Sequence, residues 1–284
     1  MLPNFLVIGS MKCGTTSLYE YVRRHPQVYM SERKELDYFS TGRDEGLTSD
    51  WYEGWFAAAD GARAVGEAST SYTKFPVHQQ VASRIGRMLP DVRLIYVVRH
   101  PIERMRSQWI HDMAQGDEVR PMPQALVEER RYLDFSRYAL QLEQYLAHFP
   151  RGQILVLTSE DLLGARRDTL KRVFEFLDVD PDWWAPEAEF EFHPSAPKRR
   201  PSTLTRNLRH VGAYRVLAGK APGFVRKLNR AALSRPMPAA STTLPDDVRR
   251  HLEGLLRQDL VALKELVGPG FDAWGLVPAT ESQR

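Results

Sequence analysis

Short apolar runs alternate with amphipathic stretches along the first two-thirds of the chain. Four runs are continuous enough to be fully buried strands, at residues 5–8, 64–66, 93–98 and 154–157. Between and after them, apolar residues recur at helical spacing over about 76–88, 101–114, 136–148 and 166–177. Strands that alternate with helices are typical of a parallel sheet covered by helices, so the pattern predicts an α/β fold.

A helix is also expected directly after the first strand. Leu18, Tyr21 and Val22 form an apolar stripe, and the dipeptide His25-Pro26 stops it. Thr16 or Ser17 is expected to cap this helix at its N-terminus.

The last third of the chain has a different pattern. Residues 181–203 are rich in Pro, Glu, Lys and Arg and predict a long irregular segment. Residues 204–267 are predicted to be mostly helical, and Leu244-Pro245 opens a final amphipathic helix that runs towards Val267. No linker separates a second domain. We therefore expect one domain over 1–284, with the α/β core in about 1–180 and the basic loop and C-terminal helices in about 181–284.

Composition narrows the class of protein. With 284 residues, 43% of them hydrophobic, the chain can bury a large core without a covalent staple. A net charge of +3 suits an anionic ligand, but the basic residues are spread out and match no nucleic-acid module. One cysteine, Cys13, excludes an intramolecular disulfide and favours a reducing compartment. The sequence has neither a leader pattern nor an apolar run of spanning length, so we expect a cytoplasmic protein with no integral membrane segment.

The stretch from Gly9 to Ser17, GSMKCGTTS, connects the first strand to its helix. Gly9 and Gly14 keep the glycine spacing of a nucleoside-triphosphatase loop, but the lysine stands at position 12 and threonines take its usual place. Successive backbone N–H groups and the positive end of a helix bind anions at such a turn. An ordinary tight turn with an exposed lysine is the alternative.

A second candidate phosphate site follows the strand at 93–98, in the stretch VVRHPIERMRSQW. Pro101 fits the first turn of a helix, which leaves Arg99 at the carboxyl end of the strand and Ser107 further along the helix. Arg99 can bind a phosphate through its planar guanidinium, and Ser107 can bind one through its hydroxyl. The alternative is that Arg99 is a surface arginine and Ser107 a neutral helix residue. A triphosphatase would need an Asp where Arg99 stands. Two phosphate sites on two parallel strands indicate a nucleotide with phosphate in two separate places.

Here the chain resembles the sulfotransferases that use 3′-phosphoadenosine-5′-phosphosulfate (PAPS), and it looks like a bacterial, cytosolic member with glycan-type motifs. The resemblance rests on FLVIGSMKCGTTSL, RLIYVVRHPIERMRSQW, ERKELDYFS and VGEASTSY in roughly the first 110 residues, and on LVLTSEDL at 155–162. It implies a P-loop-type parallel sheet flanked by helices, a largely helical C-terminal part, PAPS as co-substrate and no metal.

The resemblance also assigns residues. It implies that the 5′ end is held by Lys12, Cys13, Gly14, Thr15, Thr16 and Ser17. It implies that Arg99 and Ser107 hold the 3′-phosphate, and that a late basic loop, Lys198-Arg199-Arg200, closes over it; an exposed basic loop is the alternative.

The chemistry of sulfuryl transfer agrees with these assignments. A sulfuryl group carries less negative charge than a phosphoryl group, so in-line displacement can proceed without a metal clamp, and Lys12 would stabilise charge on the leaving oxygen. By resemblance to the glycan sulfotransferases, Glu35 is the catalytic base and Lys34 a second cation. Asp37 stands where those enzymes commonly have histidine, which leaves the acceptor class open. A solvated charge run, Glu32 to Glu35, is the other interpretation.

Three further features have weaker indications. Glu67 closes a strand and either orients the acceptor or Lys12 or caps a helix, and Ala68 replaces a lysine common in glycan enzymes. His111 is a distant alternative base. Trp51, Trp55 and Phe56 are spaced like one apolar helix face and indicate core or cleft wall.

Three functions therefore remain open: a sulfotransferase, a Mg²⁺-dependent small-molecule kinase, and a non-catalytic nucleotide-binding protein. The acceptor would carry a hydroxyl or amine and belong to a glycan, a lipid or a small molecule. The sequence indicates no nucleic-acid partner and does not determine the oligomeric state.

Overall fold

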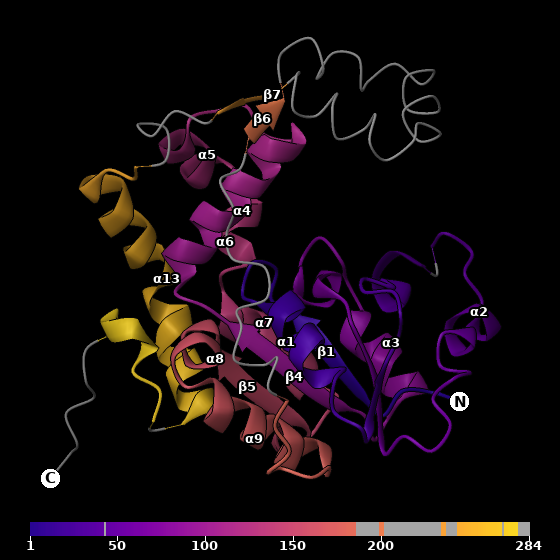
Figure 1. Cartoon of the computed structure of the whole chain (residues 1–284). Coiled ribbons are helices and arrows are strands. Elements are labelled where there is room, and N and C mark those ends of the chain that lie inside the picture. Colours follow the sequence, from indigo (N-terminus) through magenta and orange to yellow (C-terminus); the bar gives the residue numbers. More distant parts are fainter. Residues whose placement is uncertain (43, 186–198, 202–233, 237–242, 269, 278–284) are drawn as a thin grey trace, which may run out of the picture.

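The computed structural model describes residues 1–42, 44–185, 199–201, 234–236, 243–268 and 270–277. Its centre is a five-stranded, wholly parallel sheet in the order β2-β3-β1-β4-β5 (Figure 1). The strands are β1 (Phe5–Gly9), β2 (Val28–Met30), β3 (Ala64–Ala68), β4 (Arg93–Val98) and β5 (Ile154–Thr158). All four predicted strands are confirmed, and β4 has the predicted bounds. The short β2 at the sheet edge was not predicted.

Helices cover both faces of the sheet. The α-helices that follow the strands in the chain are α1 (Thr15–Val22), α2 (Ser49–Gly54), α3 (Val81–Met88), α4 (Pro101–Gln115), α5 (Met122–Glu128), α6 (Arg130–Asp134), α7 (Tyr138–Leu146), α8 (Ser159–Gly164), α9 (Arg166–Leu177) and α13 (Asp246–Val267). Shorter turns of helix are η1 (Tyr38–Gly42), η2 (Thr70–Thr73), η3 (Arg151–Gln153) and η6 (Ala273–Gly275).

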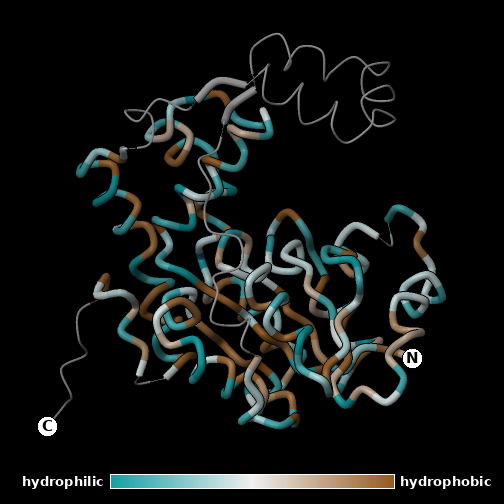
Figure 2. The backbone as a smooth tube through the Cα atoms, viewed as in Figure 1, coloured by the Kyte–Doolittle hydropathy of each residue, from teal (hydrophilic) through white to brown (hydrophobic). Residues whose placement is uncertain are grey.

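Alternation along the strands divides the core into two layers. In β1, Leu6 and Ile8 face a cluster that includes residues of α3, α4, α7 and α13, whereas Phe5 and Val7 face a cluster with α1, α8 and α9. Side chains of successive strand residues point to opposite faces, so a strand covered on both sides is apolar throughout. Figure 2 shows hydrophobic colour concentrated along the interior strands. This confirms the α/β fold with a parallel sheet flanked by helices.

Two predicted helix starts need correction. The helix expected over 76–88 begins only at Val81, because Gln80 has a left-handed backbone (φ 59°) that turns the chain into α3. Neither Thr16 nor Ser17 caps α1, which begins at Thr15. Its N-cap is Gly14 in the left-handed region (φ 90°), a conformation that glycine adopts at little cost.

The C-terminal helix agrees with its prediction. α13 runs from Asp246 to Val267, directly after Leu244-Pro245, and packs against α7. Asp259 of α13 accepts the N–H groups of Ala139 and Leu140 in the first turn of α7, at 3.1 and 2.9 Å. In the described ranges, no helix has the length and apolarity to span a bilayer.

Part of the predicted irregular segment forms a strand. β6 (Arg199–Pro201) pairs antiparallel with β7 (Ser234–Pro236), and β6 lies beside α4 (Figure 1). Residues 204–233, part of the stretch predicted to be mostly helical, lie outside the described residues, as does Lys198.

The sheet topology defines where a ligand would bind. The chain leaves β1 for β2 at one edge, returns to β3, and then crosses to β4 on the other side of β1. In open α/β sheets the crevice outside the carboxyl ends of the strands, at such a reversal of order, is the usual binding site. A ligand is therefore expected to bind at the carboxyl ends of β3, β1 and β4.

Candidate active site

The loop between β1 and α1 crosses the carboxyl edge of the sheet. The Ser10 N–H donates to the Val97 carbonyl of β4 at 2.7 Å, and the Cys13 N–H donates back to the Ser10 carbonyl at 3.1 Å. No side chain in the described part of the chain caps α1. The first N–H groups of a helix have no partner within it, so the start of α1 is a place where an anion would bind.

Gly9 makes the start of this loop possible. Its φ of 150° is rare for residues with a side chain, and a Cβ there would lie 1.9 Å from the Oγ1 atom of Thr73. The Thr73 hydroxyl donates to the Ile8 carbonyl at 3.0 Å. The loop is therefore packed directly against the last residue of η2.

Cys13 is the buried underside of the loop rather than a reactive group. Its side chain is fully buried, its Sγ lies 3.8 Å from the Tyr138 hydroxyl, and burial raises the pKa of the thiol to about 12. A thiol that is neutral at physiological pH is a weak nucleophile. Cys13 can therefore contact a ligand through its backbone only.

Arg99 lies beside the loop, as its position after β4 predicted. Its Nη1 donates to the Lys12 carbonyl at 3.4 Å, and its own carbonyl accepts the Tyr138 hydroxyl at 2.7 Å. Arg99 is half-buried, so part of it is accessible to solvent. The two candidate phosphate sites are thus neighbours, because β1 and β4 are adjacent strands.

Ser107 is half-buried on α4, six residues beyond Pro101 and so about 9 Å along the helix axis. The backbone of Arg199 and Arg200, in β6, lies against the same helix. The structure thus places part of the predicted basic loop near α4.

Glu35 lies at the carboxyl end of β3, on the other side of β1. Its backbone N–H donates to the Ala68 carbonyl at 2.8 Å. Its Oε2 accepts the Thr70 N–H at 2.7 Å and the Thr70 hydroxyl at 3.1 Å, and its Oε1 pairs with the Lys34 ammonium. With 36% of its side chain exposed, the Glu35 carboxylate is both held and accessible.

The turn that carries Glu35 has an unusual backbone. Glu35 and Asp37 are both left-handed, with φ of 59° and 57°, a region that non-glycine residues rarely occupy. The Asp37 N–H donates to the Ser69 hydroxyl at 3.0 Å, and the Asp37 carboxylate accepts the Ser71 hydroxyl. The hydroxyl run STS at 69–71 therefore holds this turn, and sequence reasoning missed it; its signal is three consecutive hydroxyl residues directly after a buried strand.

Lys74 is a second residue that the sequence did not single out. It follows η2 and is partly buried, and burial lowers the pKa of its ammonium although Glu35, Asp37 and Asp112 oppose that shift. A cation therefore lies close to the turn even though Ala68 replaces the lysine common in glycan enzymes.

Glu67 lies in the core, and its side chain is fully buried. Its carboxylate accepts hydroxyls of Tyr72 at 2.6 Å, Ser69 at 2.7 Å and Tyr52 at 3.3 Å. Burial raises the pKa of Glu67 to about 7, although these hydrogen bonds oppose the shift.

The remaining candidates lie away from the turn. His111 is half-buried on α4, one helical turn beyond Ser107. Trp51, Trp55 and Phe56 belong to or border the hydrophobic core; Phe56 is fully buried. Phe56 is therefore a core residue, whereas Trp51 and Trp55 are half-buried at the border of the core.

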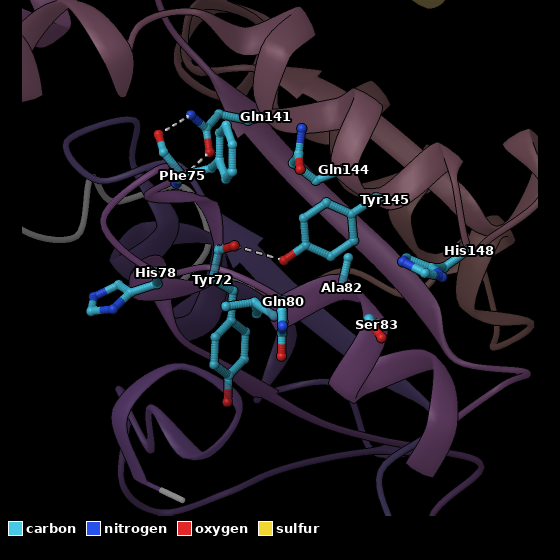
Figure 3. Close-up of a pocket in the computed structure, with 11 residues that line it drawn as sticks. Tyr72, Phe75, His78, Gln80, Ala82, Ser83, Gln141, Gln144, Tyr145 and His148 are labelled. Carbon is cyan, nitrogen blue, oxygen red and sulfur yellow. Dashed lines mark hydrogen bonds between the residues drawn. The ribbon is translucent and has the colours of Figure 1, made fainter. Parts of the chain in front are cut away.

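Two hollows lie near the turn, one beside η2 and one beside η1. A cavity of about 50 Å³ between α7 and residues 72–83 is too small for a nucleotide or sugar. Figure 3 shows how its walls are held: Gln141 bonds both the N–H and the carbonyl of Phe75, and the Tyr145 hydroxyl donates to the Tyr72 carbonyl. A more open hollow of about 360 Å³ is lined mainly by polar side chains, namely Ser40, Asp44, His78, Gln79, Gln80 and Arg84.

Together these residues form one edge. The β1–α1 loop with Lys12, the Arg99 side chain and the accessible Glu35 carboxylate lie at the carboxyl ends of β1, β4 and β3. A loop and an arginine suit a phosphorylated ligand, and a carboxylate beside them can accept a proton. The arrangement suits transfer of a charged group from a nucleotide to a nucleophile.

Comparison with known proteins gives consistent matches. The family model described as "Sulfotransferase domain" matches residues 2–194. The mouse heparan sulfate glucosamine 3-O-sulfotransferase 3B1 is 30% identical over 188 residues, which are 63% of this chain and 46% of that protein. The match thus spans less than half of that curated relative.

Solved structures share the fold. A sulfotransferase from Alicyclobacillus acidocaldarius superposes with a TM-score of 0.70 at 24% identity, over 97% of this chain and 99% of that one. A mouse sulfotransferase, complexed with PAP according to its description, superposes with a TM-score of 0.50 at 12% identity, over 91% and 84%.

Proposed function

The chain belongs to the sulfotransferase domain family, and on that basis we propose that it transfers the sulfuryl group of PAPS to a hydroxyl or amine of an acceptor. One observation carries the proposal: the β1–α1 loop, Arg99 and Glu35 lie at the carboxyl ends of three adjacent strands. A nucleotide with phosphate at two places fits the first two, and the third is a carboxylate next to them. The PAP named in the mouse structure of the same fold supports this choice of nucleotide.

The residues present suit PAPS. We assign the 5′ end to the N–H groups of the loop from Lys12 to Ser17, with Cys13 acting through its backbone and Thr15, Thr16 and Gly14 at the start of α1. We assign the 3′-phosphate to Arg99 and Ser107, and we add the predicted basic loop of Lys198, Arg199 and Arg200 because the backbone of β6 lies beside α4.

When bound, PAPS supplies an activated sulfuryl group on a mixed phosphate–sulfate anhydride. Glu35 accepts the proton of the attacking hydroxyl through Oε1, while Thr70 keeps Oε2 in place. Lys12 places positive charge at the oxygen that leaves with the nucleotide, where negative charge develops. Lys34 and Lys74 add positive charge around the carboxylate and the sulfuryl group.

The polar hollow next to η1 favours an acceptor with several hydroxyl groups. Ser40, which lines it, donates to the Asp37 carbonyl at 3.0 Å and shares a hydrogen bond with Ser71 at 2.7 Å, so the hollow adjoins the turn of Glu35. Hydrogen-bonding side chains recognise sugars better than they recognise phenols or lipid tails. The glycan substrate named for the mouse relative agrees with this acceptor class.

A transfer assay tests the proposal. The protein is incubated with ³⁵S-labelled PAPS and a panel of glycan, lipid-alcohol and phenol acceptors, and in parallel with γ-³²P-labelled ATP, each with and without excess chelator. We expect transfer of ³⁵S to the acceptor, at a rate that chelator changes by no more than about a factor of two. The rate should fall by a factor on the order of 10²–10³ in Lys12→Ala. Chelator-sensitive transfer of ³²P alone would indicate a kinase. Binding of PAP without transfer to any acceptor would indicate a nucleotide-binding protein.

The geometry of the strands beside β1 bears on the kinase alternative. A kinase of this loop type holds Mg²⁺ with a carboxylate at the end of a neighbouring strand. β4 is followed by Arg99, and the carboxylate in β3, Glu67, is buried and accepts three hydroxyls. Neither of these two strands presents a carboxylate to the loop in the way a kinase needs.

A further inference from the structure

Glu67 is a buried carboxylate that the proposed reaction does not use. It is fully buried on β3, opposite Leu6 of β1, among the aromatic rings of Tyr52 and Tyr72. Burying a carboxylate is costly unless it is hydrogen-bonded. Replacing it with an apolar residue would remove that cost, so its presence needs a reason.

Ser69 connects Glu67 to the turn of the base. The Ser69 hydroxyl donates to Glu67 Oε2 at 2.7 Å and accepts the Asp37 N–H at 3.0 Å. Asp37 is two residues from Glu35, and both have left-handed backbones. Such conformations are unfavourable for residues other than glycine and persist only where the surroundings impose them. The hydrogen bonds from Glu67 to Ser69 and from Ser69 to Asp37 are among the contacts that impose the left-handed backbone of this turn.

The charge state of Glu67 determines the direction of these hydrogen bonds. An ionised carboxylate is only an acceptor, so it orients the Ser69 hydroxyl proton towards itself and leaves an oxygen lone pair for the Asp37 N–H. A protonated carboxyl must donate one hydrogen, and one of its three hydroxyl partners must then turn round. If that partner is Ser69, its proton no longer has the carboxylate as acceptor and its geometry towards Asp37 changes.

We propose that ionised Glu67 is a positioning residue, which holds Ser69 so that the Glu35–Asp37 turn keeps the base aimed at the acceptor. The catalytic part of this inference rests on the proposed function, whereas the coupling between Glu67 and the turn does not. Two consecutive hydrogen bonds support this role, since Ser69 bonds both the Glu67 carboxylate and the backbone N–H of Asp37.

The groups that face Glu67 make its titration sensitive to its surroundings. They are the hydroxyls of Tyr52 from α2, Tyr72 from η2 and Ser69, the Asp37 carboxylate from the turn, and Tyr145 from α7. Figure 3 shows that Tyr72 is also held from the α7 side, through its carbonyl. None of these five groups is a cation, and the pKa of Glu67 is about 7, raised by burial. The carboxylate is ionised above that pH, and the turn should loosen below it.

The coupling is tested without any acceptor by ¹³C NMR of protein labelled at the glutamate carboxyl carbons. The Glu35 signal is identified by its loss in Glu35→Gln, and the Glu67 signal by its loss in Glu67→Gln. We expect the Glu35 signal of the unmodified protein to shift where Glu67 titrates, near pH 7, and this shift to vanish in Glu67→Gln. A Glu35 signal with no inflection at that pH, or one that persists in Glu67→Gln, overturns the proposal.

Turnover then tests the consequence for catalysis, with the acceptor found in the transfer assay. Glu67→Gln should lower kcat about tenfold, leave PAP binding unchanged, and flatten the dependence of kcat on pH around 7. Asp259→Asn is the control, because Asp259 is also a largely buried carboxylate whose raised pKa is about 6, but it caps α7 far along the chain from the turn. It should keep the pH profile even if it lowers stability.

The two failures are distinguishable. Unchanged kcat and pH profile in Glu67→Gln would overturn the positioning role while leaving the sulfotransferase intact. Absence of transfer by the unmodified protein would defeat the proposed function, and the NMR titration would still decide the coupling.

Discussion

Replacing Arg99 by alanine removes the guanidinium that we assign to the 3′-phosphate. The fold should tolerate the change, because the Arg99 side chain makes one long hydrogen bond, to the Lys12 carbonyl at 3.4 Å, and is only half-buried. The Tyr138 hydroxyl bonds the Arg99 carbonyl, which alanine retains. The variant therefore tests binding rather than folding.

The expected magnitude follows from mass action. At a hundred times its Kd, 3′-phosphoadenosine-5′-phosphate stabilises the native state by about 2.7 kcal/mol, which raises Tm by roughly 5–11 °C in a domain of this size. A charge-assisted hydrogen bond to phosphate contributes about 1.5–3 kcal/mol. Its loss raises Kd by roughly 10–150-fold, since about 1.4 kcal/mol corresponds to tenfold. At the same ligand concentration only about 0.3–1.3 kcal/mol remains, a shift of roughly 1–5 °C.

Thermal unfolding measures this with four ligands: 3′-phosphoadenosine-5′-phosphate, AMP, ADP and ATP. AMP has the 5′-phosphate but no 3′-phosphate, so it should shift Tm far less than the doubly phosphorylated nucleotide. Arg93→Ala is the matched control, because Arg93 begins the same strand at the opposite edge of the sheet. It should retain the full discrimination.

Equal shifts with AMP and the 3′-phosphorylated nucleotide would refute the two-phosphate argument. So would an Arg99→Ala protein that still discriminates as well as Arg93→Ala does.

Three further outcomes follow from other parts of the structure. Glu35→Gln should lower turnover by roughly 10²–10⁴ with PAP affinity nearly unchanged, whereas Glu32→Gln, an exposed neighbour, should have no effect in the same transfer assay; near-normal turnover would place the base elsewhere. Gly66→Ala should lower unfolding free energy by about 1–3 kcal/mol in denaturant titrations, because the new Cβ would lie 2.4 Å from the fully buried ring of Phe5; no loss would mean that the ring can move. The His25 ring accepts the Gln27 N–H and bonds the Asp180 carbonyl, and burial lowers its pKa below 6.5. Neutral His25 therefore stabilises the fold above about pH 6.5, and this contribution should disappear as the pH falls through its folded pKa; an NMR titration that gives a pKa above 6.5 would contradict this.

The sheet was predictable because its strands are buried on both faces. Continuous apolar runs such as RLIYVV have few other stable positions, and β4 has the predicted bounds. β2 has only three residues, too few for a periodic signal, and depends on pairing with β3. The predicted start of α3 was wrong because the hydrophobic pattern does not reveal that Gln80 has a left-handed backbone.

The site was predictable only in part. Local motifs placed the loop and Arg99, since each follows a strand directly, and their proximity follows from the adjacency of β1 and β4. The contacts of Glu35 depend on residues about 35 positions away, which no local pattern reveals. For the same reason the sequence left Glu67 with two roles and could not show that it is enclosed by hydroxyls. The role of each residue in catalysis stays a prediction.

η2 has a consequence for engineering. Thr73 packs against the start of the β1–α1 loop at Gly9, and Thr70, three residues earlier, holds Glu35. One short helical turn therefore contacts both the loop that we assign to the nucleotide and the base that we assign to the acceptor. The distance between the loop and the base therefore depends on the four residues of η2. Acceptor preference can therefore be redesigned through residues such as His78, Gln79 and Arg84, which line the hollow outside η2. Libraries that leave residues 70–73 untouched should yield many more active variants than libraries that include them.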